Sequence, residues 1–505
     1  MSLNYNFIWL LCYLLVLVGL AGYGFHRLSI VYLYWKNRNN KPQPKARFQE
    51  LPVVTVQLPM FNEKFVVDRL LESVAALDYP QDKLEIQILD DSTDDTTEQC
   101  YRKVEELKSR GFDAVCIHRT DRTGFKAGAL EAATKVAKGE FLLILDADFV
   151  PEPDLLQKTI HFFTDENVGL VQTRWGHINR EYNLLTRIQG MYLDGHFAME
   201  QTARNRSGRF FTFNGTAGIW RKCVIGDAGG WSHDTLTEDM DLSYRVQLKG
   251  WRFIYLNDVV TPAELPVDMD GFKSQQHRWT KGSIQVCQKI LLDIWRSNAP
   301  LKAKGEATTH LTCNYSYLLL ALLCFLVYPI CTQRIPENET VFMWFVNVAL
   351  FFMTSVAVCI FYMSAQIVVR PKSWWKELPY LPLLLTLSVG MAVNNAKAVL
   401  EAIFGHQSAF VRTPKYGVDR KEDRRHVSQL KRNGYRAIKS VVIPVLEIAC
   451  GTFFLNLIII MIRQGHYLSP ILMIPFLGFY YTGFCSLGRM ISNLLPAKQT
   501  AKAKN

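Results

Sequence analysis

The chain of 505 residues lacks the cysteine patterns that mark disulfide-rich and zinc-binding proteins. Its eleven cysteines contain no CxxC pair and follow no regular spacing, and several lie inside apolar segments. A disulfide framework or a cysteine zinc site needs paired or regularly spaced residues. We therefore expect free, reduced thiols.

The first residues, MSLNYN, lack the positive charge that opens a secretory signal, and no clear small-residue cleavage site follows the next apolar stretch. A positively charged start and a small-residue cleavage site are both typical of cleaved signal peptides. We therefore expect the first apolar stretch to be retained as a membrane anchor.

An excess of acidic residues is also absent, since 57 Lys and Arg stand against 46 Asp and Glu and the net charge is +11. A basic chain can bind nucleic acid, but here the basic residues lie next to apolar segments. Basic residues beside apolar segments are typical of the cytoplasmic loops of membrane proteins. The distribution predicts an integral membrane protein that contacts membrane lipids, with no nucleic-acid partner.

The apolar residues are concentrated at the two ends of the chain, while 48–300 has the composition of a soluble domain. Crossing the roughly 30 Å hydrocarbon core takes about 20 helical residues. Stretches of that length predict five membrane spans, near 7–32, 310–332, 341–369, 437–463 and 468–494.

A further apolar stretch, 378–405, is long enough to cross but has basic segments on both sides. Three basic residues lie in 370–377, and 405–440 holds ten Lys or Arg against three acids. A crossing would place one of these segments outside, against the positive-inside rule. We therefore predict an interfacial or re-entrant helix, whose polar Asn394, Asn395 and Lys397 also suit that position.

Five spans divide the chain into three parts. Residues 1–47 form an anchor with a basic linker, 48–300 form a cytoplasmic domain, and 301–505 form a transmembrane helical bundle. The plasma or inner membrane is the expected location, with the N-terminus outside.

The cytoplasmic domain alternates apolar runs with helix-like stretches. Runs rich in β-branched residues stand at 53–61, 84–92, 114–119, 141–148 and 168–175. Such runs, separated by helices, predict a mostly parallel sheet covered on both faces. Ligands bind beyond the carboxyl ends of strands in such sheets, and here three strands end in the polar sequences LPMFNE, DDS and DAD.

The DAD sequence at 146–148 permits two interpretations. Two carboxylates after a strand can share a hard cation such as Mg²⁺ or Mn²⁺, which would then bridge a diphosphate. The same residues can also cap the helix expected after FVPEPD. The acids of TED (237–239) are equally compatible with a helix N-terminus, and QQHRW (275–279) with ordinary packing.

The ordered combination of these motifs is more specific than any one of them. DDS, DAD, FNGTAG (213–218), TED, QQHRW and FVRTPK (410–415) follow one another in a single chain. This series resembles the family 2 processive glycosyltransferases, the group of cellulose, mannan and hyaluronan synthases. FNGTAGIWR and TEDMDL are most similar to the cellulose-synthase-like A and C types and their bacterial relatives. The resemblance implies an α/β domain of GT-A type joined to the transmembrane bundle.

The resemblance also implies roles for individual residues of the donor site. Phe61 would stack on the nucleotide base, and Thr413 and Lys415 would belong to a gating loop, 408–417, that closes over the nucleotide. Asp148, helped by Asp146, would bind Mg²⁺ or Mn²⁺. The remaining donor-binding residues would be Glu63, Asp91, Lys126 and Arg278.

On the acceptor side, the resemblance implies that Asp239 is the general base and that Trp279 stacks on the terminal acceptor sugar. Removal of the acceptor proton on the face opposite the leaving diphosphate gives inversion. The other acceptor-binding residues would be Gln275, Gly215, Thr216 and Glu238.

Three functions are compatible with these features. The favoured one is a synthase that extends a β-linked polysaccharide from UDP-glucose or GDP-mannose, with UDP-glucose preferred as the commonest donor in the family. The second is a glycosyltransferase that adds one or a few sugars to a membrane lipid. The third, a transporter, would need polar groups within the spans, for which Glu447 and Asn456 are the candidates, and leaves the cytoplasmic motifs unexplained.

Overall fold

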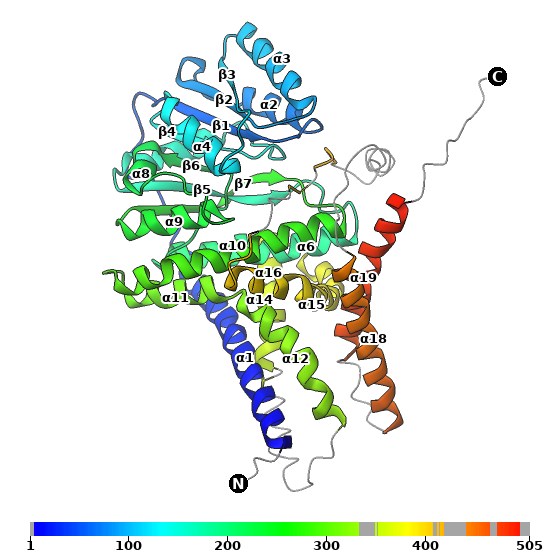
Figure 1. Ribbon diagram of the computed structural model, residues 1–505. Helices are drawn as coiled ribbons and strands as arrows, with labels where there is room; N and C mark the ends of the chain where they lie inside the picture. The colour runs from blue at the N-terminus through cyan, green and yellow to red at the C-terminus, as the bar shows by residue number, and fades with distance from the viewer. Residues whose placement is uncertain are drawn as a thin grey trace, which may run out of the picture.

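The computed structural model describes residues 5–332, 349–350, 352–407, 412–413, 415–418, 441–464 and 472–494. Figure 1 shows a sheet domain from which α1, α12 and α18 run away on one side, with α6, α10 and α16 between. The soluble and helical parts predicted from the sequence are therefore both present.

The sheet has seven strands in the order β3-β2-β1-β4-β6-β5-β7. All neighbouring pairs are parallel except those of β6, which is antiparallel to both β4 and β5. The strands are β1 Val54–Met60, β2 Leu84–Asp90, β3 Asp113–His118, β4 Phe141–Ile144, β5 Val168–His177, β6 Gly218–Arg221 and β7 Arg252–Ala263. The five predicted strands are confirmed, and β6 and β7 are additional.

Two apolar cores cover the two faces of the sheet. One packs side chains such as Val67 and Leu71 of α2 and Val104 of α3 against the sheet. The other packs Leu130 of α4 and Leu242 of α9 against the opposite face. Because β1, β2 and β4 are buried almost throughout, their carboxyl ends are held rigidly at one edge.

The helices that cover the sheet and follow it are short. They are α2 Val67–Ala75, η1 Gln81–Lys83, α3 Thr96–Ser109, α4 Phe125–Val136, α5 Leu155–Thr159, η2 Ile160–Thr164, α6 Leu184–Asp194, η3 Gly195–Gln201, α7 Thr202–Arg206, α8 Lys222–Asp227 and α9 Glu238–Leu248. The longer α10, Met269–Arg296, lies between the sheet and the apolar helices (Figure 1).

The apolar region is built from α1 Tyr5–Asn37, α11 Leu301–Thr312, α12 Tyr315–Thr332, η4 Phe352–Val356, α14 Ala357–Val369, η5 Trp374–Tyr380, α15 Leu381–Gly390, α16 Ala392–Ile403, α18 Val442–Arg463 and α19 Met473–Leu494. Among the described residues, two helices, within α1 and α18, are long and apolar enough to cross a membrane, or up to four spans if each of two bent pairs counts as one. The chain is therefore an integral membrane protein by this measure.

The predicted span 310–332 differs from the structure at its start. Residues 310–312 belong to α11, whose Ala307 and Leu311 pack against Val286 and Ile290 of α10. The direction changes by 52° before α12. Packing on α10, which hydropathy alone cannot reveal, therefore keeps the first turn of the expected span with the soluble domain.

The segment predicted to be interfacial is divided into α15 and α16, with a bend of 41°. Asn394 and Asn395 are buried against protein, and Asn394 donates a hydrogen bond to the Lys273 carbonyl of α10 at 3.1 Å, while Lys397 is exposed. The span predicted at 341–369 begins outside the described residues, which cover 349–350 and 352–369 of it.

Candidate active site

A cavity of about 190 Å³ lies at the carboxyl ends of β1, β2 and β4. All but one of the site residues predicted from the sequence line it. They are Phe61, Glu63, Asp91, Lys126, Asp146, Asp148, Gly215, Glu238, Asp239, Gln275, Arg278, Trp279, Thr413 and Lys415. Segments far apart in the chain therefore meet in one place.

Thr216 is the exception, because it is fully buried behind the cavity wall. Its Oγ1 accepts a hydrogen bond from the backbone N–H of Asp146 at 2.8 Å. The structure therefore places Thr216 where it holds the DAD segment and does not bring it to the cavity with the other residues expected to bind the acceptor.

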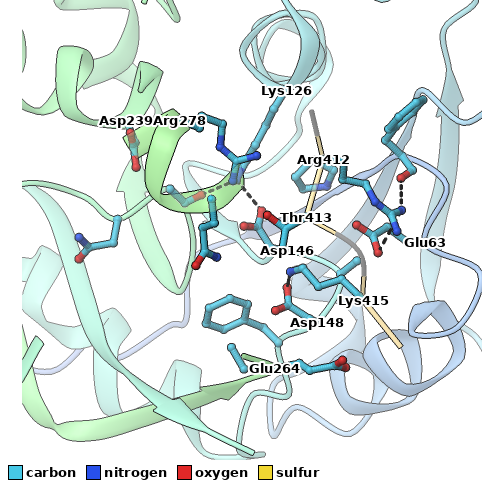
Figure 2. A pocket seen from close by; sticks show the side chains of 18 of the residues that line it. Glu63, Lys126, Asp146, Asp148, Asp239, Glu264, Arg278, Arg412, Thr413 and Lys415 are labelled. Carbon is cyan, nitrogen blue, oxygen red and sulfur yellow. Dashed lines mark hydrogen bonds and ion pairs between the residues drawn. The ribbon is translucent and has the colours of Figure 1, made fainter. Parts of the chain in front are cut away.

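Both carboxylates of DAD are paired with lysines (Figure 2). The Lys126 ammonium donates to Asp146 Oδ1 at 2.5 Å and to the Gly215 carbonyl at 2.8 Å, and Lys415 pairs with Asp148. Burial alone would lower the pKa of each lysine, but the surrounding carboxylates outweigh it and raise both pKa values. The site is thus built from closely balanced opposite charges.

The donor atoms fit Mg²⁺ or Mn²⁺, since they are carboxylate oxygens. No group of three or more His, Cys, Asp or Glu side chains suited to a metal ion occurs within the described part of the chain. Asp146 and Asp148 could therefore supply only part of the coordination shell. Such a partial set suits an ion that completes its shell with diphosphate oxygens and water.

Asp239 lies in the first turn of α9, beside Glu238. Burial, followed by the negative charge of Glu238, raises the pKa of Asp239 to about 7. The Met240 N–H donates to Asp239 Oδ1 at 2.8 Å and fixes the carboxylate. A carboxyl with a pKa near neutrality suits proton abstraction at physiological pH.

Gly215 faces this carboxylate. Its φ is +78°, and a Cβ there would lie 3.1 Å from Asp239 Oδ2 and 3.6 Å from the Lys126 ammonium. Glycine is therefore required both by the backbone conformation and by the space that the two charged groups need.

Two arginines that the sequence did not single out lie beside Phe61 and Asp91. Arg122 lies over the Phe61 ring, with its guanidinium carbon 3.3 Å from the centroid. Arg119 donates to both oxygens of Asp91, at 2.8 and 2.6 Å. Both follow β3 in a segment without a recognisable motif, so their place after a strand end was the only available sequence signal.

The described part of the predicted gating loop closes one side of the cavity (Figure 2). Arg412 donates to the Phe61 carbonyl at 2.5 Å and lies 3.4 Å from Glu63. Burial raises the pKa of Glu63 to about 7 despite the positive charges of Arg412 and Lys415. Arg412 belongs to FVRTPK and could have been assigned from its position within that motif; residues 408–411 and 414 lie outside the described residues.

Glu264 fixes the far end of this loop. Its carboxylate accepts hydrogen bonds from the backbone N–H groups of Tyr416, Gly417 and Val418, at 2.9, 3.0 and 3.2 Å. Glu264 directly follows β7, so an acid at a strand end was the available sequence signal.

The helix α10 carries Gln275, Arg278 and Trp279, which share one face at helical spacing. Its other contacts tie it to the apolar helices, for Lys273 bonds Glu447 of α18 at 2.5 Å and Ser486 of α19 at 2.9 Å. The helix that carries the predicted acceptor-binding residues Gln275 and Trp279 is therefore in direct contact with the apolar helices α18 and α19.

Comparison with known proteins agrees with this geometry. Residues 52–282 match the family profile described as Glycosyltransferase like family 2. Glucomannan 4-beta-mannosyltransferase 2 of Arabidopsis thaliana is 42% identical over 286 residues, which cover 54% of this chain and 53% of that protein. Glucomannan 4-beta-mannosyltransferase 1 of Oryza sativa subsp. japonica is 42% identical over 259 residues, or 50% of each chain. The chain spans about half the length of these curated relatives.

The fold is also similar to a solved structure, the mannosyltransferase PcManGT from Pyrobaculum calidifontis in complex with GDP-Man and Mn²⁺. The TM-score is 0.55 at 20% identity, with 78% of this chain and 100% of that chain covered. This likeness supports a GT-A-like α/β domain. The family match and the two relatives identify residues 52–282 as a glycosyltransferase domain of family 2.

Proposed function

We propose that this protein transfers mannose from GDP-mannose to the end of a growing β-linked mannan or glucomannan chain, with inversion at the anomeric carbon. The observation that carries the proposal is the meeting of Asp146, Asp148, Asp239 and Trp279 in one cavity. The names of the two curated relatives supply the sugar.

In this mechanism, Asp239 takes the proton of the acceptor hydroxyl. The acceptor oxygen then forms a bond to the anomeric carbon while the bond from that carbon to the diphosphate oxygen breaks. The bonding electron pair leaves with the nucleoside diphosphate. Because attack and departure occur on opposite faces of the sugar, an α-linked donor gives a β-linked product.

The negative charge that grows on the leaving diphosphate needs fixed positive charge around it. Lys126, Arg278 and Lys415 line the cavity and would supply it. Mg²⁺ or Mn²⁺ held by Asp148 and Asp146 would neutralise further diphosphate charge when bound. Closure of the loop at 412–418 would exclude water and so limit donor hydrolysis.

The choice of GDP-mannose departs from the sequence-based preference for UDP-glucose. The base-binding end offers Phe61 with Arg122 over its ring and Asp91 bound by Arg119, which suits a purine or a pyrimidine. The two relatives, both mannosyltransferases by name, favour mannose.

The membrane arrangement supports a polysaccharide acceptor over a lipid one. A second cavity of about 180 Å³ shares Asn214, Asp239 and Trp279 with the first and continues to Phe361 and Tyr362 of α14. Aromatic faces and polar groups together suit sugar rings. With the catalytic domain on the cytoplasmic side of the plasma or inner membrane, the product would leave through the membrane helices.

The full chain in lipid nanodiscs, given labelled GDP-mannose or UDP-glucose with Mg²⁺ or Mn²⁺, tests this proposal. We expect label from GDP-mannose in a product that a β-mannan-specific hydrolase degrades. Label from UDP-glucose alone would contradict the donor. An organic-soluble product that resists the hydrolase would show a lipid acceptor instead.

A further inference from the structure

A line of polar contacts leads from the first membrane helix to the acceptor side of the catalytic centre. Arg27 of α1 pairs with Glu200 of η3. The other Glu200 oxygen lies 3.0 Å from His196 Nδ1, and His196 Nε2 lies 3.1 Å from the Asn214 side-chain nitrogen. Asn214 directly precedes Gly215, which faces Asp239.

Each hydrogen bond from Glu200 through His196 to Asn214 has a defined donor and acceptor. Burial, with the nearby Arg204 and Arg27, lowers the pKa of His196 to about 3, so the ring is neutral. Glu200 can only accept, which places the ring proton on Nδ1 and leaves Nε2 to accept from the Asn214 amide. Gln201 donates to Asn214 Oδ1 at 2.8 Å, which fixes the amide from its other end.

The position of Asn214 gives this order a use. Asn214 lines both the donor cavity and the second cavity, and so lies where they join, beside Asp239 and Trp279. One hydrogen of the Asn214 amide is directed to His196. The second has no hydrogen-bond partner among the described residues, so it remains available to a ligand. A rigid amide at this junction can donate to a hydroxyl or ring oxygen of the acceptor.

The helix that carries His196 and Glu200 is unusual. Residues Gly195–Gln201 form a π-helical turn, which is rare and frequently found at functional sites. A Cβ at Gly195 would lie 2.7 Å from the Phe361 ring of α14, so this turn is pressed against an apolar helix. Arg27 is held from the same side, 4.6 Å above the Phe361 ring.

We propose that Arg27, Glu200 and His196 are positioning residues that hold Asn214 for the acceptor sugar, and that α1 is thereby part of the acceptor site. The inference rests on the proposed function, because it takes a sugar as the acceptor. It adds Arg27, His196 and Glu200, which none of the sequence motifs contains, to that site.

The variant His196→Phe tests the proposal in the full chain in nanodiscs, with GDP-mannose and mannose oligosaccharides as acceptors. We expect the KM for the oligosaccharide to rise roughly tenfold, the size expected for one lost hydrogen bond. Hydrolysis of GDP-mannose without acceptor and the donor KM should stay within about twofold, since neither needs the Asn214 amide. His196→Gln should recover part of the acceptor affinity because its amide can accept and donate in a similar place.

Arg27→Met should shift the acceptor KM in the same direction, because it leaves Glu200 without one of its partners. The matched control is His161→Phe, which removes another histidine ring whose nitrogen accepts only from the Phe48 N–H, far from both cavities. We expect that variant to keep the acceptor KM of the original chain.

Amide hydrogen exchange of residues 212–216 gives a readout that needs no acceptor. Faster exchange there in His196→Phe and Arg27→Met supports the positioning role, and unchanged exchange overturns it. Equal loss of donor hydrolysis and transfer would also overturn it. An original chain that hydrolyses GDP-mannose but transfers to no oligosaccharide would instead overturn the proposed function.

Discussion

Asp239 is the general base in the proposed mechanism, because the Met240 N–H fixes its carboxylate and its pKa is raised to about 7. Replacing it with asparagine keeps the shape but removes the group that accepts the proton. We expect Asp239→Asn to lower transfer by about 10²–10⁴-fold, the range for loss of general-base catalysis. GDP binding, measured by calorimetry, should change little because Asp239 contacts no group expected at the nucleotide. Equal loss of binding and transfer would contradict the role.

The pH dependence follows from the same residue. Because the pKa of Asp239 is raised to about 7, the carboxylate is protonated and inactive below that pH. We therefore expect kcat/KM for the acceptor to fall as the pH drops through about 7. Glu63 is raised to a similar pKa, so Glu63→Gln is the control. The acidic limb should persist in that variant, and its disappearance would assign the limb to Glu63.

A substitution at Gly215 tests how closely the backbone packs against the Asp239 carboxylate. An alanine there would need a backbone φ of +78°, and its methyl group would lie 3.1 Å from Asp239 Oδ2. We expect Gly215→Ala to reduce kcat strongly and to lower stability by about 1 kcal/mol through backbone strain. Thermal unfolding and transfer assays measure both effects. Gly226→Ala, where a Cβ meets open space, should leave both close to those of the original chain.

At the scale of elements, the loop at 412–418 depends on Glu264 for its closed position. A glutamine there offers only one accepting oxygen to three backbone N–H groups, and its own N–H₂ repels them. We expect Glu264→Gln to raise the Kd for GDP several-fold, measured by calorimetry with Mn²⁺. The exposed Glu98→Gln on α3 is the matched control. An unchanged Kd would show that the loop does not need this carboxylate.

The same scale shows what the sequence could and could not predict. Of the five strands found from apolar runs, β1, β2 and β5 are long and mostly buried, and the shorter β4 is fully buried. The polar ends of β1, β2 and β4 predicted the cavity. β6 has only two consecutive large apolar residues, Ile219 and Trp220, and β7 is interrupted by the polar Asn257 and Asp258, so neither stood out. All the predicted site residues except Thr216 line one cavity. Arg119, Glu264 and His196 were missed because their roles depend on contacts between segments distant in sequence.

At the scale of the whole molecule, the catalytic domain is joined to the membrane helices by buried charge. Lys273 of α10 meets Glu447 of α18, and both are almost fully buried. This contact gives a structural reason for the polar residue in that span, which a transporter would otherwise have explained. Since α10 carries Arg278 and Trp279, the position of the site follows the position of the membrane helices.

This arrangement predicts a non-additive double substitution. Removing one partner of a buried ion pair leaves an uncompensated charge and typically costs about 3–5 kcal/mol, while replacing both with apolar residues costs much less. We therefore expect Lys273→Met and Glu447→Leu each to lower the unfolding temperature in nanodiscs and to reduce transfer. The double variant should unfold at a higher temperature than either single variant. If transfer recovers with stability, the pair acts as a clamp for α10. Additive losses would contradict direct coupling, because independent sites add and contacting ones do not.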